Sequence, residues 1–191
     1  MYTRCFLKHF CILVCLSIFL FSFAERCSGQ QTTDYKVHAN IIYRFTKYIE
    51  WPENKQTGDF VIGVVGDSPV YEELRTLTAS KSVGNQRIII RKVAANAAVY
   101  SCSVLFISIE ESRSLKRTAL VTTGMPILLI TEDTGLAKKG SCINFIIVDD
   151  HLKLEINKNN IISRNLNIAS ELLKLATIVN NDNIVANNPK Q

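Results

Sequence analysis

YKVHANIIYRFTKYIEWP, residues 35–52, predicts a single amphipathic helix that ends at Trp51-Pro52. Apolar residues recur in it at spacings of three and four and form one stripe, which comprises Val37, Ile41, Ile42, Phe45, Tyr48 and Ile49. A polar stripe on the opposite side comprises Lys36, Asn40, Arg44 and Lys47. Asp34 is the expected N-cap, and Pro52 disfavours helical geometry at the residue before it. We therefore expect a first helix that packs on a core and exposes a basic face.

The N-terminal segment has the composition of a secretory signal peptide. Arg4 and Lys8 form a short basic region, and residues 10–24 are almost entirely apolar. This run of about 15 residues is shorter than the ~20 that a spanning helix needs. We expect a leader over residues 1–29, cleaved after Ala24 or Gly29, and a protein exported to the periplasm.

The charge of the chain is mild. The 191 residues include 22 basic and 17 acidic ones, a net charge of +5, and two of the basic residues, Arg4 and Lys8, precede the first expected cleavage site at Ala24. Without a clustered basic stripe, the composition does not point to nucleic acid. We expect one domain over residues 30–179 and a polar tail over residues 180–191.

Two of the six cysteines, Cys102 and Cys142, lie well inside this domain. Each begins an apolar run that resembles a strand. In an oxidising compartment they could pair as a disulfide and serve as a redox element. The alternative is that they are two small buried side chains.

Apolar runs that alternate with helical segments predict an α/β fold. Strands are expected at residues 59–66, 87–93, 103–109, 126–131, 142–148 and 152–156, the last two as an antiparallel hairpin. Helices are expected from Ser68-Pro69, over residues 112–122 and over residues 168–179. This order predicts a mostly parallel, Rossmann-like or flavodoxin-like sheet with helices on both faces and an antiparallel C-terminal hairpin.

The motifs that would indicate an enzyme are missing from the sequence. Gly66-Asp67-Ser68 lies where α/β folds hold phosphates, but neither G-x-G-x-x-G nor Gly-Lys-Ser/Thr is present. His38 and His151 have no neighbours at metal-ligand spacing, and no nucleophile elbow occurs. We expect no catalytic residues, no metal and no cofactor.

The ordered segments resemble the YfiR-like family of bacterial periplasmic proteins. The likeness covers the helix that runs into Trp51-Pro52, the strand that ends in Gly66-Asp67-Ser68, and four later segments: Cys102–Ser108, Pro126–Asp133, Gly140–Phe145 and Leu154–Asn157. The closing segment, Leu166–Ala176, is similar to the family's last helix. Ser141 and Asn165 stand where the family usually has glycine, and asparagine is the next best residue for a left-handed turn.

The resemblance implies a non-enzymatic, dimeric regulator. Such a protein binds the periplasmic sensory domain of an inner-membrane diguanylate cyclase and holds the cyclase inactive, which lowers cyclic di-GMP and disfavours biofilm. An outer-membrane partner or redox stress releases it. A sensor kinase is another candidate for the membrane partner.

A partner surface needs exposed aromatic and arginine anchors, and the first helix offers Tyr43, Arg44, Lys47 and Trp51. Trp51 is equally suited to the core. The alternative function is a periplasmic small-ligand-binding domain that uses the crevice at the carboxyl ends of the strands, around residues 66–68 and 108–111.

Overall fold

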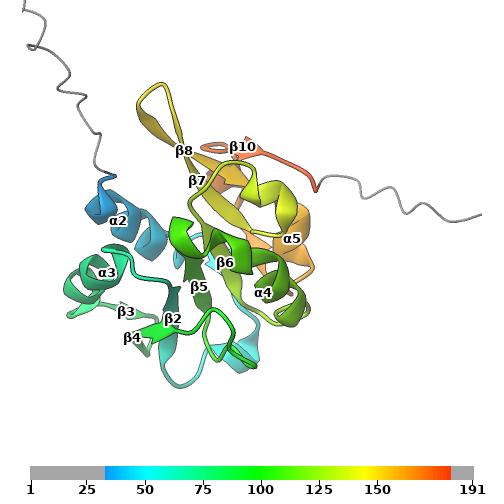
Figure 1. Ribbon diagram of the computed structural model, residues 1–191. Helices are drawn as coiled ribbons and strands as arrows, with labels where there is room; N and C mark the ends of the chain where they lie inside the picture. Colours follow the sequence, from blue (N-terminus) through cyan, green and yellow to red (C-terminus); the bar gives the residue numbers. More distant parts are fainter. Residues whose placement is uncertain (1–32, 182–191) are drawn as a thin grey trace, which may run out of the picture. The chain divides into compact units, whose positions relative to one another are not determined.

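A computed structural model describes residues 33–181, which form a helix-covered sheet (Figure 1). The helices are α2 (Tyr35–Phe45), α3 (Val70–Thr78), α4 (Leu115–Val121), α5 (Lys158–Ile162), α6 (Ser170–Leu173) and three 3-10 turns, η1 (Glu53–Lys55), η2 (Ile109–Ser114) and η3 (Leu136–Lys139). The strands are β1 (Ile49–Glu50), β2 (Phe60–Val65), β3 (Ser82–Val83), β4 (Gln86–Val93), β5 (Val104–Ile107), β6 (Leu128–Thr131), β7 (Ile143–Val148), β8 (His151–Ile156), β9 (Asn167–Ile168) and β10 (Thr177–Ile178).

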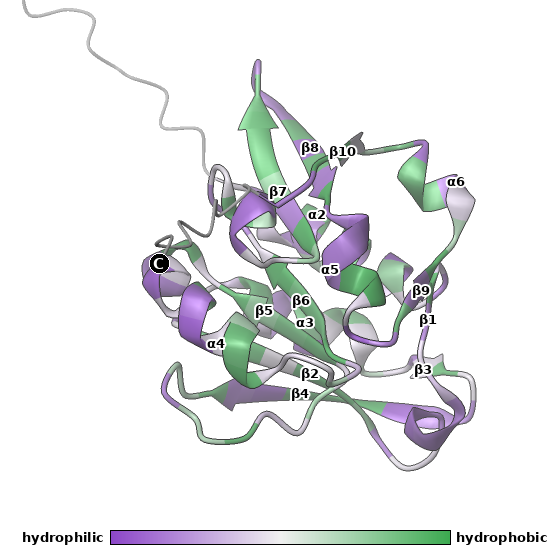
Figure 2. Cartoon of the chain, turned by 90° about the vertical axis from the view of Figure 1, so that its right-hand side faces the viewer, coloured by the Kyte–Doolittle hydropathy of each residue, from purple (hydrophilic) through white to green (hydrophobic). Residues whose placement is uncertain are grey.

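The main sheet confirms the predicted α/β class. Its eight strands run in the order β10-β8-β7-β6-β5-β2-β4-β3. The five strands β4, β2, β5, β6 and β7 run parallel to one another, β3 pairs antiparallel with β4, and β7 and β8 form the predicted antiparallel hairpin. Helices α2 and α3 lie on one side of the sheet, and α4 and α5 lie on the other (Figure 1). The central strands are fully buried and appear as the green interior of Figure 2, as expected for a sheet covered on both faces.

Turn residues set the ends of these elements. The Asp34 carboxylate accepts from the amides of Lys36 and Val37, which confirms it as the N-cap of α2. Asp149 and Asp150 both have positive φ, 49° and 60°, as a tight hairpin turn between β7 and β8 requires. Asn165 has a φ of 56°, which confirms the predicted left-handed turn.

The first helix is shorter than predicted. It ends at Phe45, and the chain then turns so that β1 pairs antiparallel with β9, with Ile49 opposite Ile168. The helical spacing of the apolar residues continues past Phe45, but the hydrogen bonds and burial that β9 provides outweigh this local preference. The apolar stripe is also rotated, because Val37 is 41% exposed whereas His38 and Ala39 are buried.

The predicted last helix, residues 168–179, is wrong for the same reason. Only Ser170–Leu173 is helical, while β9 pairs with β1 and β10 pairs in parallel with β8. Leu172 is buried, but Leu175, which would share its face in a continuous helix, is 73% exposed. The leader and all but the first two residues of the predicted tail lie outside the described residues.

The disulfide that the sequence left open is absent: Cys102 and Cys142 are both buried, free thiols. Cys102 precedes β5 and Cys142 precedes β7, and β6 lies between these two strands. Two strand spacings amount to about 9.6 Å, more than the ~7 Å between Cα atoms that a disulfide can bridge. The alternative, two buried apolar side chains, is therefore the correct interpretation.

Candidate functional site

The predicted polar stripe lies on the exposed face of α2 and continues to Lys47, two residues after the helix ends. Lys36, Asn40, Arg44 and Lys47 are all exposed, whereas His38, Ala39, Ile42 and Phe45 face the core. No carboxylate lies within 4.0 Å of the Lys36, Arg44 or Lys47 cation in the part of the chain that the structure describes. These charges are therefore available to another molecule.

The four predicted partner-binding residues do not share one environment. Arg44 and Lys47 are exposed at the C-terminal end of α2. Tyr43 is half-buried, and the Lys81 ammonium lies 5.4 Å from the centre of its ring. Trp51 is only 7% exposed, packs edge-on against Phe60 and donates from Nε1 to the Ser103 carbonyl. Trp51 is thus a core residue that packs beneath the segment following α2.

Beneath the start of α2 lies the crevice at the carboxyl ends of the parallel strands. β2 is flanked by β4 on one side and β5 on the other, so the order in which successive strands join the sheet reverses there, as at the ligand sites of open α/β sheets. The structure brings the two predicted segments together: Gly66 has a φ of +91°, and any side chain on it would collide with the Ser108 hydroxyl. Ser108 is 1% exposed, and its Oγ has no hydrogen-bond partner among the described residues.

The crevice also holds a histidine and a carboxyl group that the sequence did not associate. His38 lies between the rings of Tyr35 and Phe145, with centroids 5.4 and 4.5 Å away. Its Nδ1 is 3.1 Å from the Asp34 carbonyl, so with Nδ1 protonated the ring donates there. Its Nε2 then faces the Glu132 carboxyl group, with Nε2 and Oε2 4.0 Å apart.

Burial keeps this pair from ionising fully. Burial lowers the pKa of His38, although the Asp34 carbonyl opposes the shift. Burial raises the pKa of Glu132 to about 7. The hydrogen bond from the Ile109 amide lowers this pKa, and the nearby Glu110 charge raises it slightly. Only one signal in the sequence points to this pair: His38 lies four residues before Ile42, on the helix face that is buried.

The side chains of the chain itself occupy this crevice. His38, Ser108 and Glu132 are buried there, so it is a poor receptor for the small ligand that the alternative function requires. No group of three or more His, Cys, Asp or Glu side chains suited to a metal ion occurs among residues 33–181. Within the same residues, no helix has the length and apolar character needed to cross a bilayer.

Comparison with known proteins places the chain by its sequence pattern. A search of the curated proteins finds no match. The pattern of one family matches residues 35–177, which run from the first residue of α2 to β10 and include the basic face and the crevice. The chain therefore belongs to the YfiR/HmsC-like family, a family of periplasmic regulators associated with diguanylate cyclase signalling.

Proposed function

We propose that this protein is a non-enzymatic regulator that binds the periplasmic sensory domain of an inner-membrane diguanylate cyclase and holds the cyclase inactive. Family membership supports the class of function. The observation that supports a binding role is the exposed face of α2, with three cations that have no carboxylate within 4.0 Å among the described residues. Arginine at the centre of an interface is often an anchor of binding energy.

Arg44 and Lys47 are the proposed direct contacts, and Tyr43 contributes the edge of its ring. Val37 adds an exposed aliphatic side chain on α2, 41% exposed. Apolar area next to unpaired cations is the composition expected of a protein interface with a polar rim. Trp51 acts from the core side, since its bond to Ser103 fixes the segment that follows Lys47.

The test is capture of the membrane partner by the mature domain, from residue 30 onward, with crosslinking in membrane extract of its own host. The wild-type domain should enrich a diguanylate cyclase over an unrelated periplasmic protein. Arg44→Glu with Lys47→Glu should reduce capture by roughly tenfold or more. The control, Arg113→Glu with Lys116→Glu, makes the same charge change at exposed positions of η2 and α4 and should leave capture unchanged.

Two outcomes would contradict separate parts of the proposal. If the wild-type domain enriches no cyclase, the assigned function is wrong; a sensor kinase in its place would redirect the function to that class of enzyme. If both double variants capture equally well, the function stands but the α2 face is not the contact surface. Deleting the gene should raise the cellular level of cyclic di-GMP. Expression of the wild-type chain should lower it again to the original level.

We further propose that the chain is exported through its leader and forms a homodimer. N-terminal sequencing of the periplasmic fraction should find a first residue of Glu25 or Gln30, and an uncut Met1 would contradict the cleavage. Light scattering of the mature domain should give twice the chain mass. A single-chain mass at micromolar concentration would refute the dimer.

A further inference from the structure

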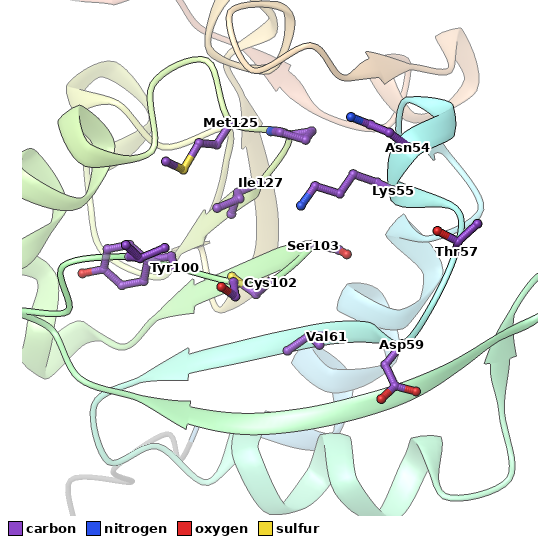
Figure 3. A pocket seen from close by; sticks show the side chains of 13 residues that line it. Asn54, Lys55, Thr57, Asp59, Val61, Tyr100, Cys102, Ser103, Met125 and Ile127 are labelled. Carbon is purple, nitrogen blue, oxygen red and sulfur yellow. The ribbon is translucent and has the colours of Figure 1, made fainter.

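A pocket opens at the amino-terminal ends of β2, β5 and β6 (Figure 3). The crevice lies at the opposite, carboxyl ends of the same strands. Its volume is about 470 Å³, within the range of small-molecule sites. Three segments that are distant in sequence contribute its walls: the η1 loop, the chain leading into β5, and the chain leading into β6. The side chains that matter for the argument are Lys55, Asp59, Val61, Cys102, Met125 and Ile127.

One cation points into this pocket. Figure 3 shows the Lys55 side chain extending from η1 so that its ammonium lies among the lining side chains. No carboxylate of the described residues is within 4.0 Å of this ammonium. The nearby Asp59 carboxylate is already occupied by the Arg87 guanidinium, with N–O distances of 3.3 Å. The pocket therefore offers one positive charge without a counter-ion.

Apolar side chains line part of the pocket. Val61 and Met125 are half-buried and supply aliphatic and thioether surface, with the buried Ile127 and the Cys102 thiol among the lining residues. Cys102 is 6% exposed, and burial raises its pKa to about 12, although the Lys55 charge opposes the shift. At neutral pH the thiol is protonated and behaves as a small apolar group.

The wall that carries Lys55 is held in place without a ligand. Gln86 is 6% exposed and donates from Nε2 to the carbonyl oxygens of Lys55 and Thr57, at 3.0 and 3.2 Å. The side-chain amide of Gln56 donates from Nε2 to the Trp51 carbonyl at 3.1 Å. Because these bonds fix the η1 loop, a ligand would bind a site that is already formed and would not have to order it.

We propose that this pocket binds a small amphipathic monocarboxylate, with its carboxylate on the Lys55 ammonium and its hydrocarbon or aromatic part against Val61 and Met125. A charge-assisted contact to lysine selects the anion, and the two apolar side chains select the body attached to it. This inference does not depend on the proposed partner, since the pocket lies at the opposite edge of the sheet from the crevice and is lined by none of the α2 contact residues.

The protein has a built-in reporter for this site. Trp51 is the only tryptophan of the chain, and its indole donates to the carbonyl of Ser103, which lines the pocket. A ligand that contacts this segment should change the tryptophan emission. The probes are 3-phenylpropionate and its neutral amide, 3-phenylpropionamide, which differ only in charge and one hydrogen-bonding group.

Wild-type protein should bind the carboxylate at least roughly tenfold more tightly than the amide. Lys55→Met should remove this preference while retaining weak binding of both probes, and its thermal midpoint should stay close to that of wild type. Lys116→Met, which removes the same charge at an exposed position of α4 outside the pocket, should retain the preference. Ligand-observed NMR with the same probes provides a readout that does not depend on Trp51.

Three results would overturn the proposal: equal binding of acid and amide by the wild-type protein, an unchanged preference in Lys55→Met, or no saturable binding of either probe at millimolar concentration. None of these results bears on the capture of a cyclase. A failed pocket and a failed partner assignment are therefore distinguishable.

Discussion

Replacing Glu132 with glutamine should reveal how much the buried carboxyl group costs the fold at neutral and alkaline pH. Its side chain is 5% exposed and accepts from the Ile109 amide through Oε1 at 3.0 Å. Glutamine retains an oxygen in that position and cannot ionise. The substitution therefore removes the charge and keeps the shape and the hydrogen bond.

The expected magnitude follows from the pKa. Burial raises the pKa of Glu132 from an ordinary value of 4.5 to about 7 in the folded protein. At 1.36 kcal/mol per pKa unit, ionised Glu132 lowers the free energy of unfolding by about 3 kcal/mol above pH 7. Below pH 4.5 the carboxyl group is protonated in both states. Its stabilising contribution is then present in full, and it is lost as the pH rises through 7.

Glu132→Gln should therefore be more stable than wild type by about 3 kcal/mol at pH 8, and this difference should shrink towards zero at pH 4.5. His38 has the opposite sign, because its folded-state pKa is lowered and its contribution is lost as the pH falls below 6.5. His38 is present in both proteins and faces Glu132, so the difference between the two stability curves reports Glu132 together with its coupling to His38.

The assay is urea unfolding at several pH values between 4.5 and 8, followed by the emission of Trp51. Glu171→Gln is the matched control, since Glu171 is exposed on α6 and its substitution should change stability little at any pH. A Glu132→Gln protein that is less stable than wild type at pH 8 would refute the reasoning. So would a stability difference that does not vary with pH.

Three further predictions concern other buried or strained positions. Ser108→Ala should stabilise the protein by about 1 kcal/mol in urea unfolding, because the Ser108 hydroxyl lacks a partner among the described residues. Ser141→Ala should destabilise it by a similar amount, because the Ser141 hydroxyl has two backbone carbonyls within hydrogen-bond distance to donate to, and the same sign for both variants would contradict the assignment. Asn165→Gly should be tolerated, whereas Asn165→Val should cost about 1–2 kcal/mol because of the positive φ; equal midpoints would argue against a left-handed turn. Reductant should leave the unfolding midpoint of the mature domain unchanged, and mass after alkylation should count Cys102 and Cys142 as free thiols; a bridge between them would contradict the strand order.

Much of the candidate site could be assigned to faces of the fold from sequence. Helical spacing predicted that Arg44 and Lys47 are exposed, and both are, although Lys47 follows the end of α2. Spacing could not decide between surface and core for Trp51, because an aromatic side chain suits both. It also missed the His38–Glu132 pair and the Lys55 pocket, whose members come from separate elements and meet only when β2, β5 and β6 align.

The sequence by itself determined the central architecture of this protein. Continuous apolar runs specified the buried parallel strands, the paired aspartates specified the hairpin turn, and Asp34 specified the start of α2. These are local signals, each carried by a few neighbouring residues that fix their own backbone geometry or burial.

Only the tertiary structure decided the ends of α2, the break-up of the last helix and the separation of the two cysteines. Residues 49–50 and 167–168 continue a helical pattern, yet they become strands because each supplies the hydrogen-bonding partner that the other lacks. Cys102 and Cys142 stay apart because β6 lies between their strands. Each of these outcomes depends on which distant segment becomes a neighbour. The pattern of adjacent residues does not specify the hydrogen bonds and burial that such a distant neighbour provides.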